Sequence, residues 1–163
     1  MMVTYKLFSE EIEEVDYQLI AIHTTIEDFR LAYFINKNLS ISLSKHPEDL
    51  SIQDKNREIY FSRFYFEDDN NSISWNLIQN KSEDDQNMAT LSTGLFADSI
   101  SRVSTKTHLI PEYKRVDYFL KVDKSFTDAQ IQETISKIKK IQKVSTVYTI
   151  DAEKIKSKNN LIF

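Results

Sequence analysis

Hydrophobic and polar residues alternate most clearly in the middle of the chain. Two β-rich runs, Ile59–Glu67 and Ser72–Gln79, are separated by Asp68–Asn71, four residues of the types that tolerate left-handed backbone. The pattern predicts a β-hairpin in which Glu67 pairs with Ser72. In that register one face of the hairpin is aromatic and aliphatic and belongs to the core, whereas the other face is mixed.

A first helix is predicted from Ile26 to about Lys37. Thr25 is a suitable N-cap, and Asp28 three residues later completes a pair resembling a capping box. At 100° per residue, Phe34 falls within the polar arc, so it is either covered by another segment or exposed as a contact. The residues expected to be buried form an arc of about 200°: Ile26, Phe29, Leu31, Ala32, Tyr33, Ile35 and Asn36.

A second helix is predicted after Thr127, which forms a capping box with Gln130. Its apolar stripe is narrow, and lysines lie mostly outside it, which is typical of a helix on a protein surface. The stripe consists of Ile131, Ile135, Ile138 and Ile141, and the lysines are Lys137, Lys139, Lys140 and Lys143.

Further strands and loops complete the predicted fold. No structure is assigned to most of residues 88–107. Loops are expected at Lys45–Glu58 and Asn80–Asn87, and Lys154–Phe163 is a candidate edge segment. The remaining strands are Val3–Phe8, Asp16–Thr24, Leu39–Ser44, Val116–Val122 and Val144–Ile150. We therefore predict one α+β domain, residues 1–163, with a mixed or antiparallel sheet, a central hairpin and two main helices on one face. This order of elements admits two β-α-β units.

Composition narrows the chemistry. The chain has 163 residues, no cysteine and one glycine, Gly94. Thiolate catalysis, disulfides and sulfur-ligated zinc are excluded, and one glycine cannot build a dinucleotide-binding fingerprint or a phosphate loop. His46 and His108 are isolated, and Asp68–Ser72 lacks the glycine and distal glutamate of a calcium loop. We expect neither a cofactor nor a metal.

The charge is unevenly distributed. The formal net charge is −4, with 10 basic and 18 acidic side chains in residues 1–111 but 11 basic and 7 acidic in residues 112–163. The lysines of the second helix could contact an anion, but the acidic balance argues against nucleic acid as the main partner. The chain shows no signal-peptide core and no apolar run of about 20 residues, so we expect a cytoplasmic protein that does not enter a membrane.

One motif is specific enough to indicate a family. Within Leu109–Lys121, the residues Ile110, Pro111, Glu112, Val116, Asp117 and Tyr118 stand at the spacing that names the IPExxxVDY family. Two other segments, Ala21–Tyr33 and Ser74–Lys81, also fit, so the chain resembles this family over most of its length. The resemblance implies a small cytoplasmic bacterial protein. It carries over no activity, cofactor or catalytic residue.

Four side chains are candidates for a polar cluster: Glu112, Asp117, Arg30 and His23. Because charged residues are seldom buried unless they are paired, the two carboxylates could form an ion-pair lock or a polar pocket with Arg30 or Arg115. A catalytic pair of carboxylates is the competing interpretation, although no nucleophile or electrophile stands beside them in the sequence. His23 could act as a ligand or as an acid–base group, or it could bond locally.

Two aromatic residues, Phe34 and Tyr65, are candidates for a contact surface because their positions leave them outside the expected core. Dense aromatic content without a catalytic constellation favours a non-catalytic protein-interaction or regulatory domain with a protein partner. The alternative is a small-ligand-binding sensor built on paired β-α-β units, and a carboxylate-dependent enzyme is a further alternative.

Overall fold

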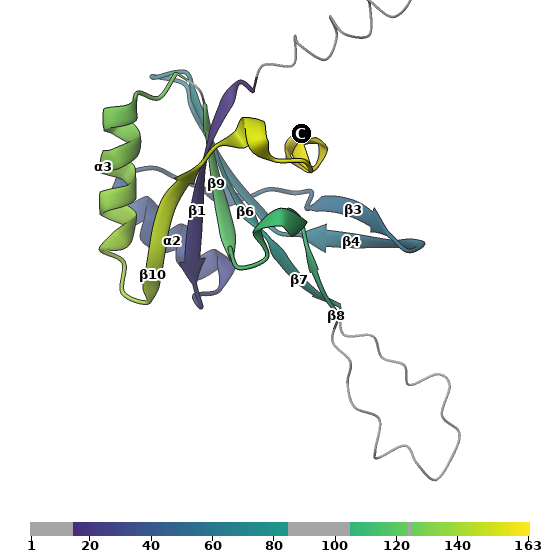
Figure 1. The fold of residues 1–163 in the computed structure, drawn as a ribbon. Helices are drawn as coiled ribbons and strands as arrows, with labels where there is room; N and C mark the ends of the chain where they lie inside the picture. The colour runs from purple at the N-terminus through teal and green to yellow at the C-terminus, as the bar shows by residue number, and fades with distance from the viewer. Residues whose placement is uncertain (1–14, 85–104, 124) are drawn as a thin grey trace, which may run out of the picture.

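The computed structural model describes residues 15–84, 105–123 and 125–163 of the chain. A central sheet carries two helices on one face, which confirms the predicted α+β class (Figure 1). The predicted strand Val3–Phe8 and most of the unassigned stretch lie outside the described residues. The prediction of a single domain stays a prediction.

The main sheet has six strands, and each pair of neighbouring strands is antiparallel. The strand order is β10 (Val144–Ile150), β1 (Tyr17–Thr24), β9 (Tyr118–Asp123), β6 (Ile73–Gln79), β5 (Arg63–Asp68) and β2 (Ser44–Lys45). Strand β1 therefore lies between two strands that come more than 90 residues later in the chain.

Both β-α-β units are present, in split form. The first comprises β1, α2 (Asp28–Leu39) and β2, and the second comprises β9, α3 (Asp128–Lys139) and β10. Alternating directions across the sheet make the two strands of each unit parallel to each other. They are not neighbours, because β1 separates β9 from β10 and three strands separate β1 from β2.

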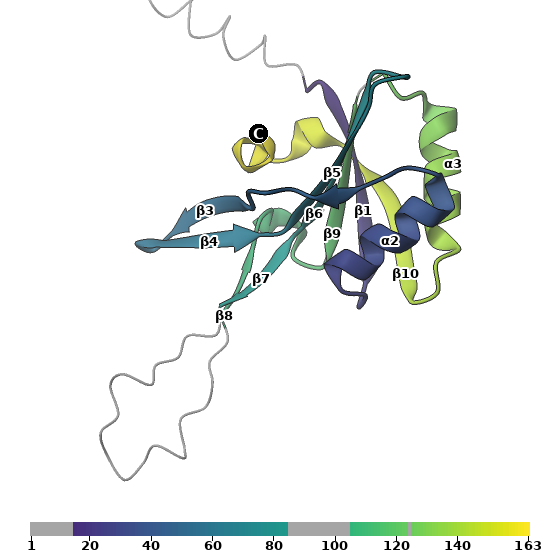
Figure 2. The same cartoon turned by 180° about the vertical axis from the view of Figure 1, so that it is seen from behind.

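Helices α2 and α3 cover the same face of the sheet (Figure 2). Their inward residues pack on a layer contributed by the inner strands, with Trp75 and Phe126 in edge-to-face contact at a ring distance of 5.1 Å. The fully buried centre of this layer includes Ile20, Ile22, Leu31, Ile35, Leu77, Leu120, Val122 and Ile138.

The second face of the sheet is also buried, but without an α-helix. It is covered by a hairpin of β3 (Leu50–Asp54) and β4 (Arg57–Phe61), by residues 109–116 and by the C-terminal residues. The C-terminal residues form two 3-10 helices, η4 (Ala152–Lys154) and η5 (Lys158–Leu161), instead of an edge strand. Ile155 and Leu161 anchor them in the core.

The β5–β6 hairpin is confirmed, but its predicted register was wrong by two residues. Asp68 pairs with Ile73, and Glu67 pairs with Ser74 instead of Ser72. The Asp68 carboxylate accepts hydrogen bonds from the backbone amides of residues 70 and 71, and Ser72 adopts a φ of 53°, which moves the turn to residues 69–72. Because the shift is even, each side chain keeps its predicted face.

The predicted strand Leu39–Ser44 was wrong. Helix α2 continues through Leu39, and Ser40 closes it with a left-handed conformation. The Asn36 side chain then binds Leu43 through both backbone groups, accepting from its N–H at 2.7 Å and donating to its carbonyl at 3.0 Å. These bonds satisfy the backbone at Leu43 without a strand partner, and β2 is confined to Ser44–Lys45.

Two predicted loops contain hairpins. In the first, Lys55 and Asn56 both have positive φ, as a two-residue turn between β3 and β4 requires. The second predicted loop holds β7 (Lys81–Asp84), which pairs with β8 (Thr105–His108) across residues 85–104. The predicted strand at Ile59–Glu67 is interrupted at Ser62, where β4 ends and β5 begins.

The two predicted helix caps had opposite outcomes. The capping box of α3 is confirmed: Gln130 N–H donates to Thr127 Oγ1 at 3.2 Å, and Thr127 N–H donates to Gln130 Oε1 at 2.8 Å. The box at Thr25 was wrong, because α2 begins later with Glu27 at the N-cap and no side-chain cap. The hydroxyl that binds a free amide there belongs to Thr24, which accepts from Ile26 N–H.

Candidate functional site

The segment Leu109–Lys121 is fastened by Asn80, a fully buried residue directly after β6. Its side-chain amide donates to the carbonyls of Tyr113 at 2.9 Å and Val116 at 2.8 Å, and its oxygen accepts from Ile110 N–H at 2.9 Å. The Asn80 backbone adds bonds to Leu109 and Asp117. One side chain thus fixes both ends of the short 3-10 turn η3 (Pro111–Tyr113).

Asp117 connects three elements. One carboxylate oxygen accepts from the backbone N–H of Thr24 at 2.8 Å, at the end of β1. The other accepts from the ammonium of Lys81 on β7 at 2.7 Å, and both side chains of this pair are about a quarter to a third exposed. Asp117 therefore forms an ion pair with Lys81, and the predicted pairing with Arg30 or Arg115 was wrong.

The Glu112 side chain binds the C-terminal residues and not the elements that Asp117 connects. Its carboxylate accepts from the backbone amides of Lys156 and Ser157, each at 3.2 Å, and from the Ser157 hydroxyl at 2.6 Å. Partial burial alone would raise the pKa of Glu112, but the bonds from Ser157 and Lys156 outweigh it and hold the pKa below its usual value. The two carboxylates have no hydrogen-bond partner in common among the described residues.

The other two members of the predicted cluster lie elsewhere. Arg30 is exposed on α2. His23 lies on β1 beside β10, where its Nε2 is 3.0 Å from the Tyr148 hydroxyl and the two rings are 5.5 Å apart. Within the described ranges, the four predicted residues therefore do not form one polar site, and three of them contribute separate contacts between strands, loops and the C-terminal residues.

The motif ends with Tyr118, whose ring is buried beneath the start of α2. Its hydroxyl donates to the carbonyl of Ile26 at 2.8 Å. Burial raises the pKa of the Tyr118 phenol, and the nearby carboxylates of Asp28 and Asp117 raise it further. The phenol therefore stays neutral at physiological pH, and its contact positions the entry to the helix.

The predicted contact residues are partly buried. Phe34 packs against the helix-side core, and Tyr65 lies edge-to-face against His46 at 4.8 Å. Phe29 and Tyr33, which were expected in the core, are 59% and 61% exposed. Compared with the predicted arc, the buried stripe of α2 is rotated towards Phe34, because the sheet contacts the helix along Leu31, Ala32 and Ile35.

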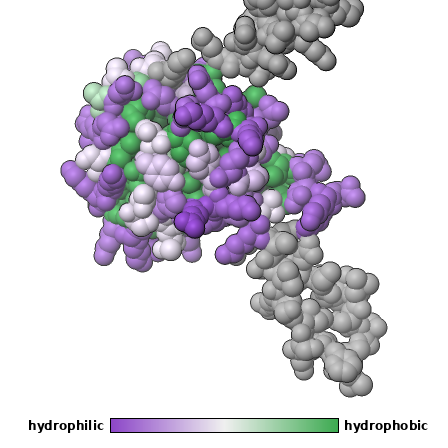
Figure 3. All heavy atoms as spheres, viewed as in Figure 1, coloured by the Kyte–Doolittle hydropathy of each residue, from purple (hydrophilic) through white to green (hydrophobic). Residues whose placement is uncertain are grey.

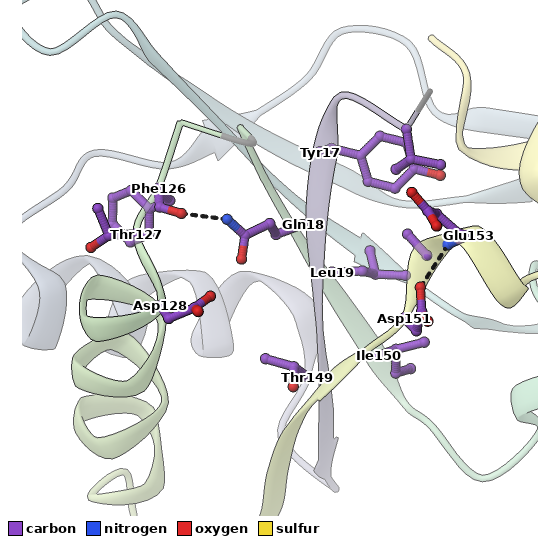
Figure 4. Close-up of a pocket in the computed structure, with 12 residues that line it drawn as sticks. Tyr17, Gln18, Leu19, Phe126, Thr127, Asp128, Thr149, Ile150, Asp151 and Glu153 are labelled. Atoms are coloured by element: carbon purple, nitrogen blue, oxygen red, sulfur yellow. Dashed lines mark hydrogen bonds between the residues drawn. The ribbon is translucent and has the colours of Figure 1, made fainter. Parts of the chain in front are cut away.

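A groove of about 500 Å³ opens where β10 leaves the sheet, beside the first turn of α3 (Figure 4). Apolar and polar side chains line the groove in similar measure, and carboxylates lie on opposite rims, Asp128 on α3 and Asp151 and Glu153 after β10. Within it, the Gln18 side chain donates to the carbonyl of Phe126. The groove also includes Val15, Tyr17, Leu19, Thr127, Thr149, Ile150 and Ala152. No signal in the sequence places these separated segments together.

A smaller hollow of about 200 Å³ lies on the second face of the sheet around Lys121. The Lys121 ammonium donates to the Leu161 carbonyl at 2.8 Å and lies over the rings of Tyr17 and Phe163, 4.6 and 4.1 Å from their centres. The Arg63 guanidinium is 4.2 Å from the same Phe163 ring. Burial lowers the pKa of Lys121. Lys121 and Arg63 therefore both contact Phe163 of the same chain.

The described residues give no support for a metal site, since no three histidine or carboxylate side chains among them lie close enough to hold an ion. In the same part of the chain, no helix has the length and apolar character needed to cross a membrane.

Comparison of the chain with models of protein families, with curated proteins and with solved structures finds no match.

Proposed function

We propose that this protein is a non-catalytic interaction domain that binds a protein partner through the outer face of α2. The observation that carries the proposal is the pair Phe29 and Tyr33, two aromatic side chains one helical turn apart that are both more than half exposed. The opposite face of the same helix is fully packed, so folding itself does not require these two rings.

The energetics favour a contact at this position. Burying a large apolar side chain is worth about 1.5–3 kcal/mol, and aromatic residues are enriched among the residues that dominate binding. Arg30 and Lys37 are exposed on the same helix. The partner surface we propose is therefore an apolar groove with acidic residues at its rim.

Site-specific crosslinking tests this surface. A photoreactive amino acid at Lys37, one turn beyond Tyr33, is expected to capture a partner in lysate of the source cells. The same group at Tyr60, another exposed position, on β4, serves as the matched control. Phe29→Ser with Tyr33→Ser should abolish the adduct at position 37 without changing the melting temperature by more than about 2 °C. Equal adducts at both positions, or an adduct that survives the double substitution, would contradict the proposal.

The groove beside α3 favours a second candidate, a sensor for a small cationic ligand. Its volume lies within the range of about 300–1,000 Å³ that is typical of small-molecule sites, and its rim carries three carboxylates. A thermal-shift screen with small amines and guanidines should then raise the melting temperature by mass action. No response at millimolar concentrations would refute it. The carboxylate-dependent enzyme receives least support, because Glu112 and Asp117 bind different parts of the fold.

Membership of the IPExxxVDY family, and with it a bacterial cytoplasmic origin, is also a proposal. It is supported by the motif residues, each of which contributes to the fold. Ile110 and Val116 are buried, and the side chains of Glu112, Asp117 and Tyr118 bind segments distant in the sequence. A motif retained for the fold would show such contacts without implying any activity.

A further inference from the structure

The smaller hollow, around Lys121 on the second face of the sheet, carries two rows of charge. The first row is cationic. Lys121 on β9 pairs with Asn76 on β6, and Arg63 on β5 reaches the same place, where its Nε donates to the Asn76 Oδ1 at 3.0 Å. Both cationic residues are partly buried. The floor of the hollow therefore consists of an ammonium, a guanidinium and an amide.

The second row is acidic and lies beside the first. Glu67 pairs with Ser74 across β5 and β6 and accepts from its hydroxyl at 2.6 Å. Asp123 follows Lys121 by two residues on β9, so both side chains point to the same face. Two residues of a strand span about 6.5–7 Å, which sets the distance between the Cα atoms of the two rows. A third carboxylate, Asp16, also lines the hollow and is exposed.

Asn76 presents a polar group that the fold itself does not bind. The residue is 7% exposed, and its Oδ1 accepts from Arg63, but its Nδ2 donates to no acceptor among the described residues. Every fully enclosed side-chain nitrogen and oxygen in the described ranges has a partner, so this Nδ2 opens to the hollow that Asn76 lines. Because a nearly buried donor needs an acceptor, the open Nδ2 is completed by a group from outside the protein.

We propose that the hollow binds a small α-amino acid as its zwitterion. The carboxylate of the amino acid accepts from Arg63, Lys121 and the Asn76 Nδ2, and its ammonium donates to the acidic row of Glu67 and Asp123. The observation that selects this ligand is the closeness of the two rows: a plain anion would be repelled by the carboxylates, and a plain cation by the ammonium and the guanidinium. The volume of about 200 Å³ is below the roughly 300–1,000 Å³ of drug-sized sites, so the ligand is small.

The bonds already present leave room for such a ligand. The Lys121 ammonium has three N–H donors, and one of them goes to the Leu161 carbonyl at 2.8 Å. Burial lowers the pKa of Lys121, nearby Asp16 partly opposes this, and Arg63 lowers the pKa further. A bound carboxylate would therefore relieve the repulsion between the two cations. Phe163 lines the hollow without filling it, since the free volume is present with its ring in place.

The surrounding surface also favours a polar ligand. Hydrophilic residues predominate on the side of the molecule where the C-terminal residues lie (Figure 3). The proposal goes beyond the partner surface on α2 and uses neither Phe29 nor Tyr33. The hollow also differs from the groove beside α3, whose lining includes carboxylates but no lysine or arginine from the described part of the chain.

An NMR titration of the full chain measures both affinity and location. L-Alanine and L-serine, each up to about 50 mM, are the probes, and at least one should bind with a Kd of roughly 0.1–10 mM, as expected for so few atoms. The shifts of backbone amide signals should concentrate at residues 74–76 and 121–123. No binding by either probe, or shifts concentrated in the groove beside α3, overturns the proposal.

Ligands that carry a single charge test recognition of the zwitterion. Propionate is L-alanine without its amino group, and ethylamine is L-alanine without its carboxylate. Each should bind at least about tenfold more weakly than the amino acid, because each leaves one row of charge without a partner. If propionate or ethylamine binds as tightly as the amino acid, the hollow recognises one charge and the proposal is overturned.

Two substitutions test the two rows separately. Arg63→Gln removes a cation and Glu67→Gln removes a carboxylate, and each should raise the Kd at least about fivefold. Lys139→Gln, at an exposed position on α3, is the matched control and should leave the Kd unchanged. Because Glu67 is exposed, its variant keeps the test valid if Arg63→Gln lowers stability. An unchanged Kd in Glu67→Gln, or in both variants, overturns the proposal.

The outcomes separate this proposal from the proposed function. The Phe29→Ser, Tyr33→Ser variant should bind the amino acid with the wild-type Kd, because the two substituted side chains lie on α2 and do not line the hollow. Loss of binding in that variant would overturn the site at Lys121. Absence of a crosslinked partner on α2 leaves the expected titration unchanged.

Discussion

Replacing Asn80 with alanine removes three hydrogen bonds from the interior of the fold. The substitution leaves the N–H of Ile110 and the carbonyl of Val116 without this partner, whereas the Tyr113 carbonyl keeps its bond from the Val116 N–H at 3.1 Å. Two of these bonds are buried and the third is partly buried. At about 1–3 kcal/mol for each buried group left unsatisfied, the expected loss of unfolding free energy is about 3–5 kcal/mol. That is a large part of the roughly 5–15 kcal/mol that stabilises a typical domain.

Equilibrium unfolding in urea measures this loss. The Asn80→Ala protein should unfold at a lower urea midpoint with an unchanged slope, because the surface exposed on unfolding stays nearly the same. Asn71→Ala is the matched control: its side chain makes an exposed bond to Asp68 at 2.7 Å, so its cost should stay below about 1 kcal/mol. A cost below about 1 kcal/mol for Asn80→Ala would refute the argument that this residue fastens the motif segment.

Three further predictions concern the contacts around the core. Thr127→Ala should destabilise the protein by about 1 kcal/mol, measured by thermal denaturation, because it removes the cap of α3. Tyr118→Phe should cost about 1–3 kcal/mol near pH 8. The pKa of the wild-type Tyr118 phenol is raised, so above about pH 10 the native state keeps a proton that the unfolded chain releases. The unfolding free energy of the wild type therefore falls above that pH, and its difference from that of the variant narrows in urea titrations. In a double-mutant cycle, Asp117→Asn and Lys81→Met should couple by less than about 1 kcal/mol, since their ion pair is partly exposed. A difference in unfolding free energy between wild type and Tyr118→Phe that stays constant with pH would contradict the second prediction. A coupling energy above about 1 kcal/mol between Asp117 and Lys81 would contradict the third.

The sequence predicted elements whose signals are local. The α3 capping box and the β5–β6 hairpin depend on residues within a few positions of one another, and both were correct in kind. The first helix cap failed because two adjacent threonines offer similar chemistry. Which of them binds a free amide is decided by the distant Lys143 carbonyl, to which the Thr24 hydroxyl donates.

Exposure on α2 could not be derived from periodicity alone. The predicted arc was wide enough to include Phe29 and Tyr33, and only the position of the sheet decides which side of that arc is covered. The same limit applies to the polar cluster, because its true partners are Lys81 and the backbone near residue 157. Asn80 carried little signal of its own, because Gln79 before it is also an amide and only the structure shows which of the two is fully buried.

The inner position of β1 has a consequence for how the protein is made. Both neighbours of this strand are translated long after it, with Ile150 following Leu19 by more than a hundred residues. At typical synthesis rates of about 5–20 residues per second, β1 leaves the ribosome on the order of ten seconds before its last neighbour exists. During that interval its apolar side chains have no native cover, so nascent chains of this protein should depend on chaperone binding more than chains whose first strand pairs with the second.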